Sequence, residues 1–162
     1  MKLSLNRSLV LALLLPLFLA PALSAQTATK KVLTLEAAKK IAAAAEAEAR
    51  KNQWNVAVTI VDDGGNLVYL QRMDGTQIAS IDISQFKARS AIGFKRPTKD
   101  FADTLAGGGS YVLKVPWLAP FEGGLPLVIG GEFVGAIGVS GVTSQQDGVV
   151  AAAGVSVAVK MK

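Results

Sequence analysis

The sequence predicts a single α+β domain built around an antiparallel sheet. Two pairs of β-branched, apolar segments are each joined by a short turn that contains Gly-Gly, which is typical of β-hairpins. Helical segments precede, separate and follow these hairpins and do not alternate with single strands, which argues against a parallel βαβ sheet. A chain of 162 residues is long enough for one domain with its own core.

The first 25 residues have the layout of a secretory signal peptide. Lys2 and Arg7 precede the apolar run 9–20, and small residues at 21–25 offer a cleavage site after Ala25. The run is short for a membrane span, although a retained anchor is the alternative. We therefore predict a signal peptide at 1–25, a flexible leader at 26–32 and a domain at 33–162. The mature protein would be periplasmic or secreted and free of the membrane.

Composition excludes several classes of function. The chain has 17 basic and 12 acidic residues, so its net charge of +5 falls to +3 once Lys2 and Arg7 are removed. An excess this small does not indicate nucleic-acid binding. The chain has no Cys, which excludes disulfides and thiolate chemistry. It also has no His, which excludes Ser-His-Asp triads, histidine zinc sites and the usual proximal haem ligand.

The individual elements follow from local signals. Thr34 is placed to cap an alanine-rich helix at about 35–52, and Thr143 with Gln146 forms a capping box for a final helix at 144–160. A middle helix at 79–94 carries the stripe Ile83, Phe86, Ser90 and Phe94, with Lys87 and Arg89 on either side. Thr98 is placed to cap a short helix that runs through Leu105. Five strands are predicted, at 55–61, 66–72, 111–115, 125–129 and 132–140.

The stretch "FEGGLPLVIGGEFVGAIGVSG" (121–141) raises the question of nucleotide binding. Gly135 and Gly138 fall inside a predicted strand, and no Lys-Ser or Lys-Thr follows, so neither a dinucleotide fingerprint nor a P-loop is present. We expect these glycines to allow close packing of the first or last helix, both of which have methyl-rich faces. The free amides at the helix start after Gly141 could still hold an anion.

Four ordered segments resemble one family. "EGGLPLVIGGEFVGAIGVSGVTSQQD", "LTLEAAKKIAAAAEAEA", "VAVTIVDDGGNLVYLQRMDG" and "SIDISQFKARSAIGFKRPT" are similar to the signature segments of the GlcG/HbpS family, which includes the carboxy-terminal domain of PduO-type proteins. Asp147 matches an aspartate of that signature, and the resemblance covers about residues 33–160.

The resemblance implies a profilin-like fold, a five-stranded antiparallel sheet with helices on both faces. It also implies an extracytoplasmic homo-oligomer that binds haem, and some members degrade haem or serve redox sensing. GlcG and PduO relatives are connected with glycolate and corrinoid metabolism. Because this chain lacks His, a haem iron would need another ligand, and the candidates are Tyr111, Tyr69 and Met73. Tyr111 is the better of these because it follows a glycine run, whereas Tyr69 and Met73 suit core or sheet positions equally well.

A basic cluster and an acidic loop supply the other candidate site residues. Arginine forks bind carboxylates, so Arg89 or Arg96 could bind haem propionates or a small organic acid, although a solvated helix face would look the same. Glu122 is the one candidate general base. The predicted ligand-binding residues are Lys87, Arg89, Arg96, Thr98, Tyr111, Glu122, Gly123 and Gly124.

Three functions remain open from the sequence. The first is an exported small-ligand-binding protein with haem as the leading ligand. The second is an enzyme or accessory protein for a small organic acid, with Lys87, Arg89 and Glu122 as its working groups. The third is a ligand-free oligomer held together by faces of small residues.

Overall fold

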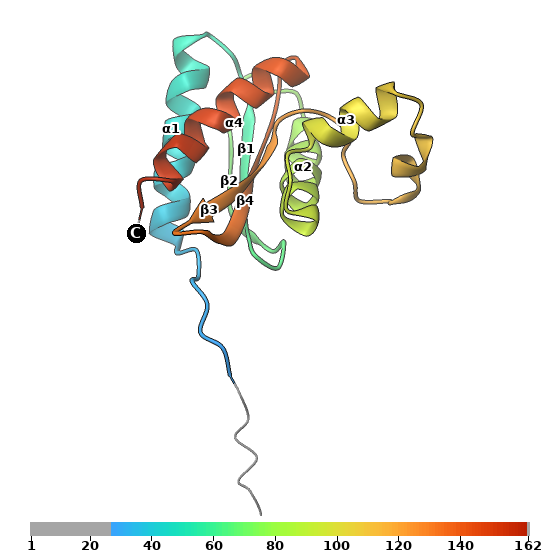
Figure 1. Ribbon diagram of the computed structural model, residues 1–162. Coiled ribbons are helices and arrows are strands. Elements are labelled where there is room, and N and C mark those ends of the chain that lie inside the picture. The colour runs from blue at the N-terminus through green and yellow to red at the C-terminus, as the bar shows by residue number, and fades with distance from the viewer. Residues whose placement is uncertain (1–26, 162) are drawn as a thin grey trace, which may run out of the picture.

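The computed structural model describes residues 27–161, which form one layered α+β domain (Figure 1). The elements in chain order are α1 (Leu35–Lys51), β1 (Ala57–Asp62), β2 (Leu67–Arg72), α2 (Ser80–Phe94), α3 (Lys99–Ala106), the 3-10 helix η1 (Ser110–Lys114), β3 (Gly124–Ile129), β4 (Glu132–Ser140) and α4 (Ser144–Ala158). Helices α1 and α4 cover one face of the sheet and α2 covers the other, as predicted (Figure 1).

The sheet has four strands in the order β2-β1-β4-β3, and every neighbouring pair is antiparallel. The two predicted hairpins are confirmed, with turns at residues 63–66 and at Gly130-Gly131. Asp62 pairs with Gly135 across β1 and β4, so both hairpin turns lie at the same end of the sheet. We call this end the foot of the sheet.

The fifth predicted strand, at 111–115, does not form, and the sheet therefore lacks one strand of the profilin-like arrangement that we expected. Residues 110–114 make a 3-10 helix, with a hydrogen bond from the Val112 N–H to Gly109 O. β-branched residues favour a strand only where a neighbouring strand pairs with them. This segment leaves the body of the domain with α3, so no strand lies beside it (Figure 1). We call residues 99–119 the arm.

The face covered by α1 and α4 contains the main hydrophobic core. The alanine face of α1 is confirmed, with Ala38, Ala42 and Ala45 fully buried, and the Thr34 hydroxyl accepts a hydrogen bond from the Ala37 amide as the predicted N-cap. Gly154 of α4 lies against Ile41, where an added Cβ would be 3.2 Å from its side chain. Small residues therefore bring α1 and α4 close together over β1 and β4.

The opposite face is covered by α2, and here two predictions were wrong. The helix that packs on Gly138 is α2 and neither α1 nor α4, because an added Cβ at Gly138 would lie only 2.6 Å from the Ala88 amide nitrogen. The buried face of α2 also differs from the predicted stripe, because Ser90 is buried but Phe86 is exposed. The buried side consists mainly of small residues, namely Ser80, Ser84, Ala88 and Ala91, together with Lys87. Bulky side chains would hold α2 away from the thin strand at Gly138.

The leader crosses the foot of the sheet. Residues 27–34 have no helix or strand, and 27–32 are exposed. Lys30 forms an ion pair with Asp63 at 2.7 Å, and the Lys31 amide donates to the Glu132 carboxylate at 3.3 Å. The predicted signal peptide lies outside the described residues. Within 27–161 no helix has the length and apolar character to cross a bilayer.

Candidate functional site

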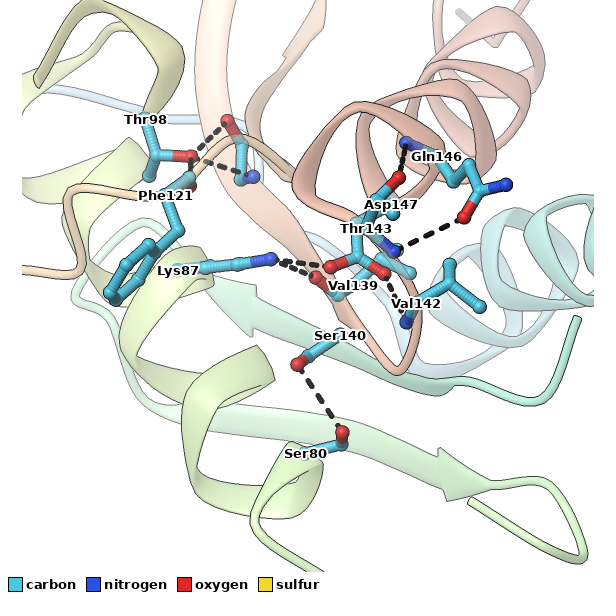
Figure 2. Close-up of polar contacts among 11 residues, drawn as sticks. Ser80, Lys87, Thr98, Phe121, Val139, Ser140, Val142, Thr143, Gln146 and Asp147 are labelled. Carbon is cyan, nitrogen blue, oxygen red and sulfur yellow. Dashed lines mark hydrogen bonds and ion pairs between the residues drawn. The ribbon is translucent and has the colours of Figure 1, made fainter. Parts of the chain in front are cut away.

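The loop 121–124, which we call the cap loop, is held by Thr98. The Thr98 hydroxyl donates to Phe121 O at 2.6 Å and accepts from the Gly124 amide at 2.9 Å, and its backbone amide donates to Gly124 O at 2.9 Å. Figure 2 shows the hydrogen bonds of the Thr98 hydroxyl. Thr98 is fully buried and precedes α3 without capping it through its side chain. Its function in this fold is to anchor the cap loop.

Beneath the cap loop lies a buried ion pair that joins α2 to α4. The Lys87 ammonium donates to an Asp147 carboxylate oxygen at 2.7 Å and to Val139 O at 2.9 Å (Figure 2). The other Asp147 oxygen accepts from the Val142 amide at 3.2 Å. Lys87 is 1% exposed and Asp147 is 2% exposed, so both charges are removed from water and are satisfied within the protein. The sequence pattern predicts Lys87 at the side of the stripe on α2, and the structure instead buries its side chain.

Burial dominates the acid–base behaviour of the pair. Desolvation lowers the pKa of Lys87, and the negative charges of Asp147 and Glu122 oppose this change. Desolvation likewise raises the pKa of Asp147, opposed by the Lys87 charge and by the amides of Val142 and Gly141. The two groups therefore depend on each other to remain charged inside the domain.

The helix start at 141–143 is not free to bind an external anion. The Asp147 carboxylate already accepts from the Val142 amide there, and Thr143 and Gln146 complete the predicted capping box. Gly123 has φ +122°, and an added Cβ would lie 2.8 Å from the Asp147 Cβ. The glycines of the cap loop are thus needed for packing over the ion pair.

A groove lies beside α2, between the β1–β2 turn and the arm. It has a volume of about 430 Å³ and is lined by the β1–β2 turn, by Arg89, Ile92 and Gly93 of α2, and by Trp117 of the arm. Residues 87 and 89 are two positions apart on a helix and point to different sides, which explains why Lys87 is buried whereas Arg89 is exposed. Arg89 has no carboxylate partner among residues 27–161.

The indole of Trp117 is fixed in place by other aromatic side chains. It stacks on Phe94 with ring centroids 5.4 Å apart, and Phe94 meets Phe101 edge-on at 5.0 Å. The Arg96 guanidinium lies over both phenyl rings, at 5.8 Å from Phe94 and 5.0 Å from Phe101. An added Cβ at Gly93 would be 3.1 Å from the indole, so this glycine gives the ring its place against α2. Arg96 therefore supports the stack and is not among the residues of the groove.

The remaining predicted site residues do not form one cluster. Tyr69 is half-buried on β2 and donates to Gln71 at 2.9 Å, whereas Met73 is buried in the main core. Tyr111 is 66% exposed on the arm and is the accessible one of the three candidate iron ligands. Glu122 is half-buried against Gly148 at the start of α4. Residues 27–161 contain no group of three or more acidic side chains arranged to hold a metal ion.

The sequence did not predict two relations in this region, namely the partner of Lys87 and the place of Trp117 in the groove. The partner of Lys87 lies 60 positions away, and the spacing of charges along the chain gives no signal for that pairing. Trp117 was not among the predicted ligand-binding residues, yet it lines the groove with Arg89. The available sequence signal for Trp117 was its position between two prolines in a connection that begins with a run of glycines.

The fold and the groove define a small α+β domain with a surface groove that carries an arginine and an indole, and with a buried ion pair that joins α2 to α4. The chain belongs to the HbpS-like family, whose model is described as "Haem degrading protein HbpS-like" and matches residues 33–156. The GlcG/HbpS resemblance of the four sequence segments is thereby confirmed.

Individual relatives agree with this assignment. Protein GlcG of Escherichia coli K12 is 42% identical over 112 residues, which are 69% of this chain and 84% of GlcG. The crystal structure of a double mutant of Streptomyces reticuli HbpS has a TM-score of 0.76 at 34% identity, covering 85% of this chain and 94% of HbpS. A structure described as a PduOC–haem complex has a TM-score of 0.72 at 26% identity, covering 78% and 95% of the two chains.

Proposed function

We propose that this protein binds haem, or a related flat ring that carries carboxylates, at the groove beside α2. The observation that carries the proposal is the pairing of an exposed Arg89 without a carboxylate partner in residues 27–161 with the fixed indole of Trp117. Membership of the HbpS-like family and similarity to a haem-complexed structure support haem as the first ligand to test.

The chemistry of the groove fits this ligand. The Arg89 guanidinium can bind a propionate through two parallel hydrogen bonds, and the indole of Trp117 offers an apolar surface to the ring. Bound haem would supply redox-active iron, and the residues named here would orient it. For the iron we propose Tyr111 as the phenolate ligand, because it is exposed on the same arm that carries Trp117.

Export and self-assembly form the second part of the proposal. The signal-peptide layout of residues 1–25 supports a periplasmic or secreted location. The arm and the cap loop expose Leu113 and Phe121, which are 59% and 50% accessible. Large exposed apolar side chains on neighbouring segments are typical of interaction surfaces, and we propose that they join copies of this chain into a homo-oligomer.

Titration of the purified protein with hemin tests ligand binding. We expect a shift of the Soret band, and we expect Arg89→Gln to weaken binding by about tenfold or more, as for the loss of one charge-assisted hydrogen bond. Tyr111→Phe is expected to change the position of the Soret band, because it removes the phenolate oxygen.

Arg96→Gln is the matched control, since it removes a guanidinium that stacks on Phe94 and Phe101 outside the groove. Absence of any Soret shift at micromolar hemin would overturn haem binding. Equal affinities for the Arg89 and Arg96 variants would overturn the groove as its site.

The alternative enzymatic arrangement receives less support from the geometry. Lys87 is enclosed in its ion pair, Glu122 lies against Gly148, and Arg89 faces the groove on another side of α2. The three groups proposed to work together therefore do not share one open site.

A further inference from the structure

A second cavity lies at the foot of the sheet, on the face covered by α1 and α4. Its volume is about 470 Å³, within the range of small-molecule sites. The leader and the start of α1 form one side, and the end of the β3–β4 hairpin with Met161 forms the other. We call it the foot cavity. The sheet separates it from the groove beside α2, so the two sites are independent.

The inner wall of the foot cavity is apolar. Leu33, Ile129 and Val134 line it, and these side chains are 6%, 8% and 1% exposed as members of the main core. Ala37 and Met161 also line the cavity and pack on the same core, and the exposed Val32 lines it as well. A ligand that entered would therefore bury an apolar segment against existing core side chains, which is favourable in proportion to the area removed from water.

The rim of the cavity is polar and carries an excess of positive charge. Lys40 lines it but is paired with Glu36 at 2.7 Å. Lys31 lines it with its ammonium 3.5 Å from Ile129 O, and it forms no ion pair with another residue in 27–161. The backbone amide of Lys31, and not its ammonium, binds Glu132. The start of α1 borders the same rim and adds the positive end of a 17-residue helix.

We propose that the foot cavity binds a monocarboxylate with an apolar tail, of the medium-chain fatty acid class. The carboxylate binds the Lys31 ammonium at the rim, close to the start of α1. The tail lies on Leu33, Ile129 and Val134. A single uncompensated cation above an apolar wall selects one negative charge joined to a hydrocarbon, and it disfavours fully polar acids.

Isothermal titration of the purified protein with decanoate tests the proposal. Decanoate should bind more tightly than hexanoate, and acetate should give no measurable heat, because only the longer tails cover the apolar wall. Lys31→Gln should weaken decanoate binding by about tenfold or more, as expected for one charge-assisted hydrogen bond. Ala37→Phe should weaken it as well, because the larger side chain occupies the cavity.

Lys30→Gln is the matched control, because it removes a neighbouring lysine that pairs with Asp63 and does not line the cavity. It should bind decanoate like the parent protein. Hemin should not displace decanoate. This result would distinguish the foot cavity from the groove, whether or not haem binds in the groove. No binding of decanoate, equal loss in the Lys30 and Lys31 variants, or competition by hemin would each overturn the proposal.

Discussion

Substitution of Asp147 by asparagine is expected to lower the free energy of unfolding by about 3 to 5 kcal/mol. The change leaves the Lys87 ammonium buried beside Val139 O without its counter-charge. Lys87→Met should be destabilising by a similar amount, since it leaves the Asp147 carboxylate buried. Because both side chains take part in one interaction, the decrease in the free energy of unfolding should be smaller in the double variant than the sum of the decreases in the two single variants. Urea unfolding of the four proteins measures these differences.

The exposed ion pair between Lys99 and Asp103 provides the control. Its N–O distance is also 2.7 Å, but both side chains are at least half exposed. Asp103→Asn should therefore change stability by no more than about 1 kcal/mol. If Asp147→Asn were as mild as Asp103→Asn, the buried pair would not hold α2 to α4 in the way described here.

The free energy of unfolding of Asp147→Asn should depend on pH in a defined direction. Burial lowers the pKa of Lys87, and Asp147 gives the largest opposing contribution, so Asp147→Asn should lower that pKa further. A lysine whose folded-state pKa lies below its unfolded value releases its proton first in the folded protein, so stability rises with pH in that window. The loss of stability in Asp147→Asn relative to the parent should therefore become smaller as the pH rises toward the ordinary lysine pKa of about 10.4.

Substitution of Gly138 by alanine is expected to be destabilising by at least about 3 kcal/mol. The added methyl group would lie 2.6 Å from the Ala88 amide nitrogen and 3.0 Å from the Ala88 Cβ, and closer still to Ser84 O. Backbone atoms on both sides cannot rotate away as a side chain could, so α2 would have to move off the sheet. Because α2 carries Arg89, hemin affinity should fall together with stability.

Gly107→Ala is the matched control for this prediction. An added Cβ there would meet Asp103 O at 3.4 Å and Thr104 O at 3.5 Å, which are ordinary contact distances. Its effect on stability should stay within about 1 kcal/mol, as for surface substitutions away from special features. Equal urea midpoints for the Gly107 and Gly138 variants would contradict the close approach of α2 to β4.

Local signals in the sequence predicted most of the elements. Thr34 and the Thr143–Gln146 capping box mark helix starts that the structure confirms, because a cap is decided by residues three positions apart. The turns at Gly64-Gly65 and Gly130-Gly131 likewise identify the two hairpins. In both hairpin turns glycines adopt positive φ, which other residues rarely do.

Long-range relations could not be read from the chain. The segment 111–115 has the composition of a strand, but a strand forms only where a partner strand lies beside it. The edge strands of the sheet are β2 and β3, and this segment pairs with neither of them. The buried face of α2 follows from Gly138 on β4, some 50 residues away, and the ion pair joins positions 87 and 147. Contacts between residues this far apart in the sequence can be identified only in the folded structure.

The difference between local signals and long-range contacts also explains the roles of the predicted site residues. Lys87, Thr98, Gly123 and Gly124 carry the family resemblance, and the structure places all four in the internal packing around the cap loop. Arg89 and Trp117, which line the groove, lie outside that buried network.

Amide NMR spectra of the protein with and without hemin test the central claim most directly, because paramagnetic iron broadens the signals of nearby residues. We predict that broadening is strongest at Gly64–Asn66, at Arg89–Gly93 and at the indole N–H of Trp117, the residues around the groove. Broadening centred instead on Gly123–Gly124 and on 141–143, with the groove unaffected, would show that the cap loop and ion pair form the binding site and would contradict this account.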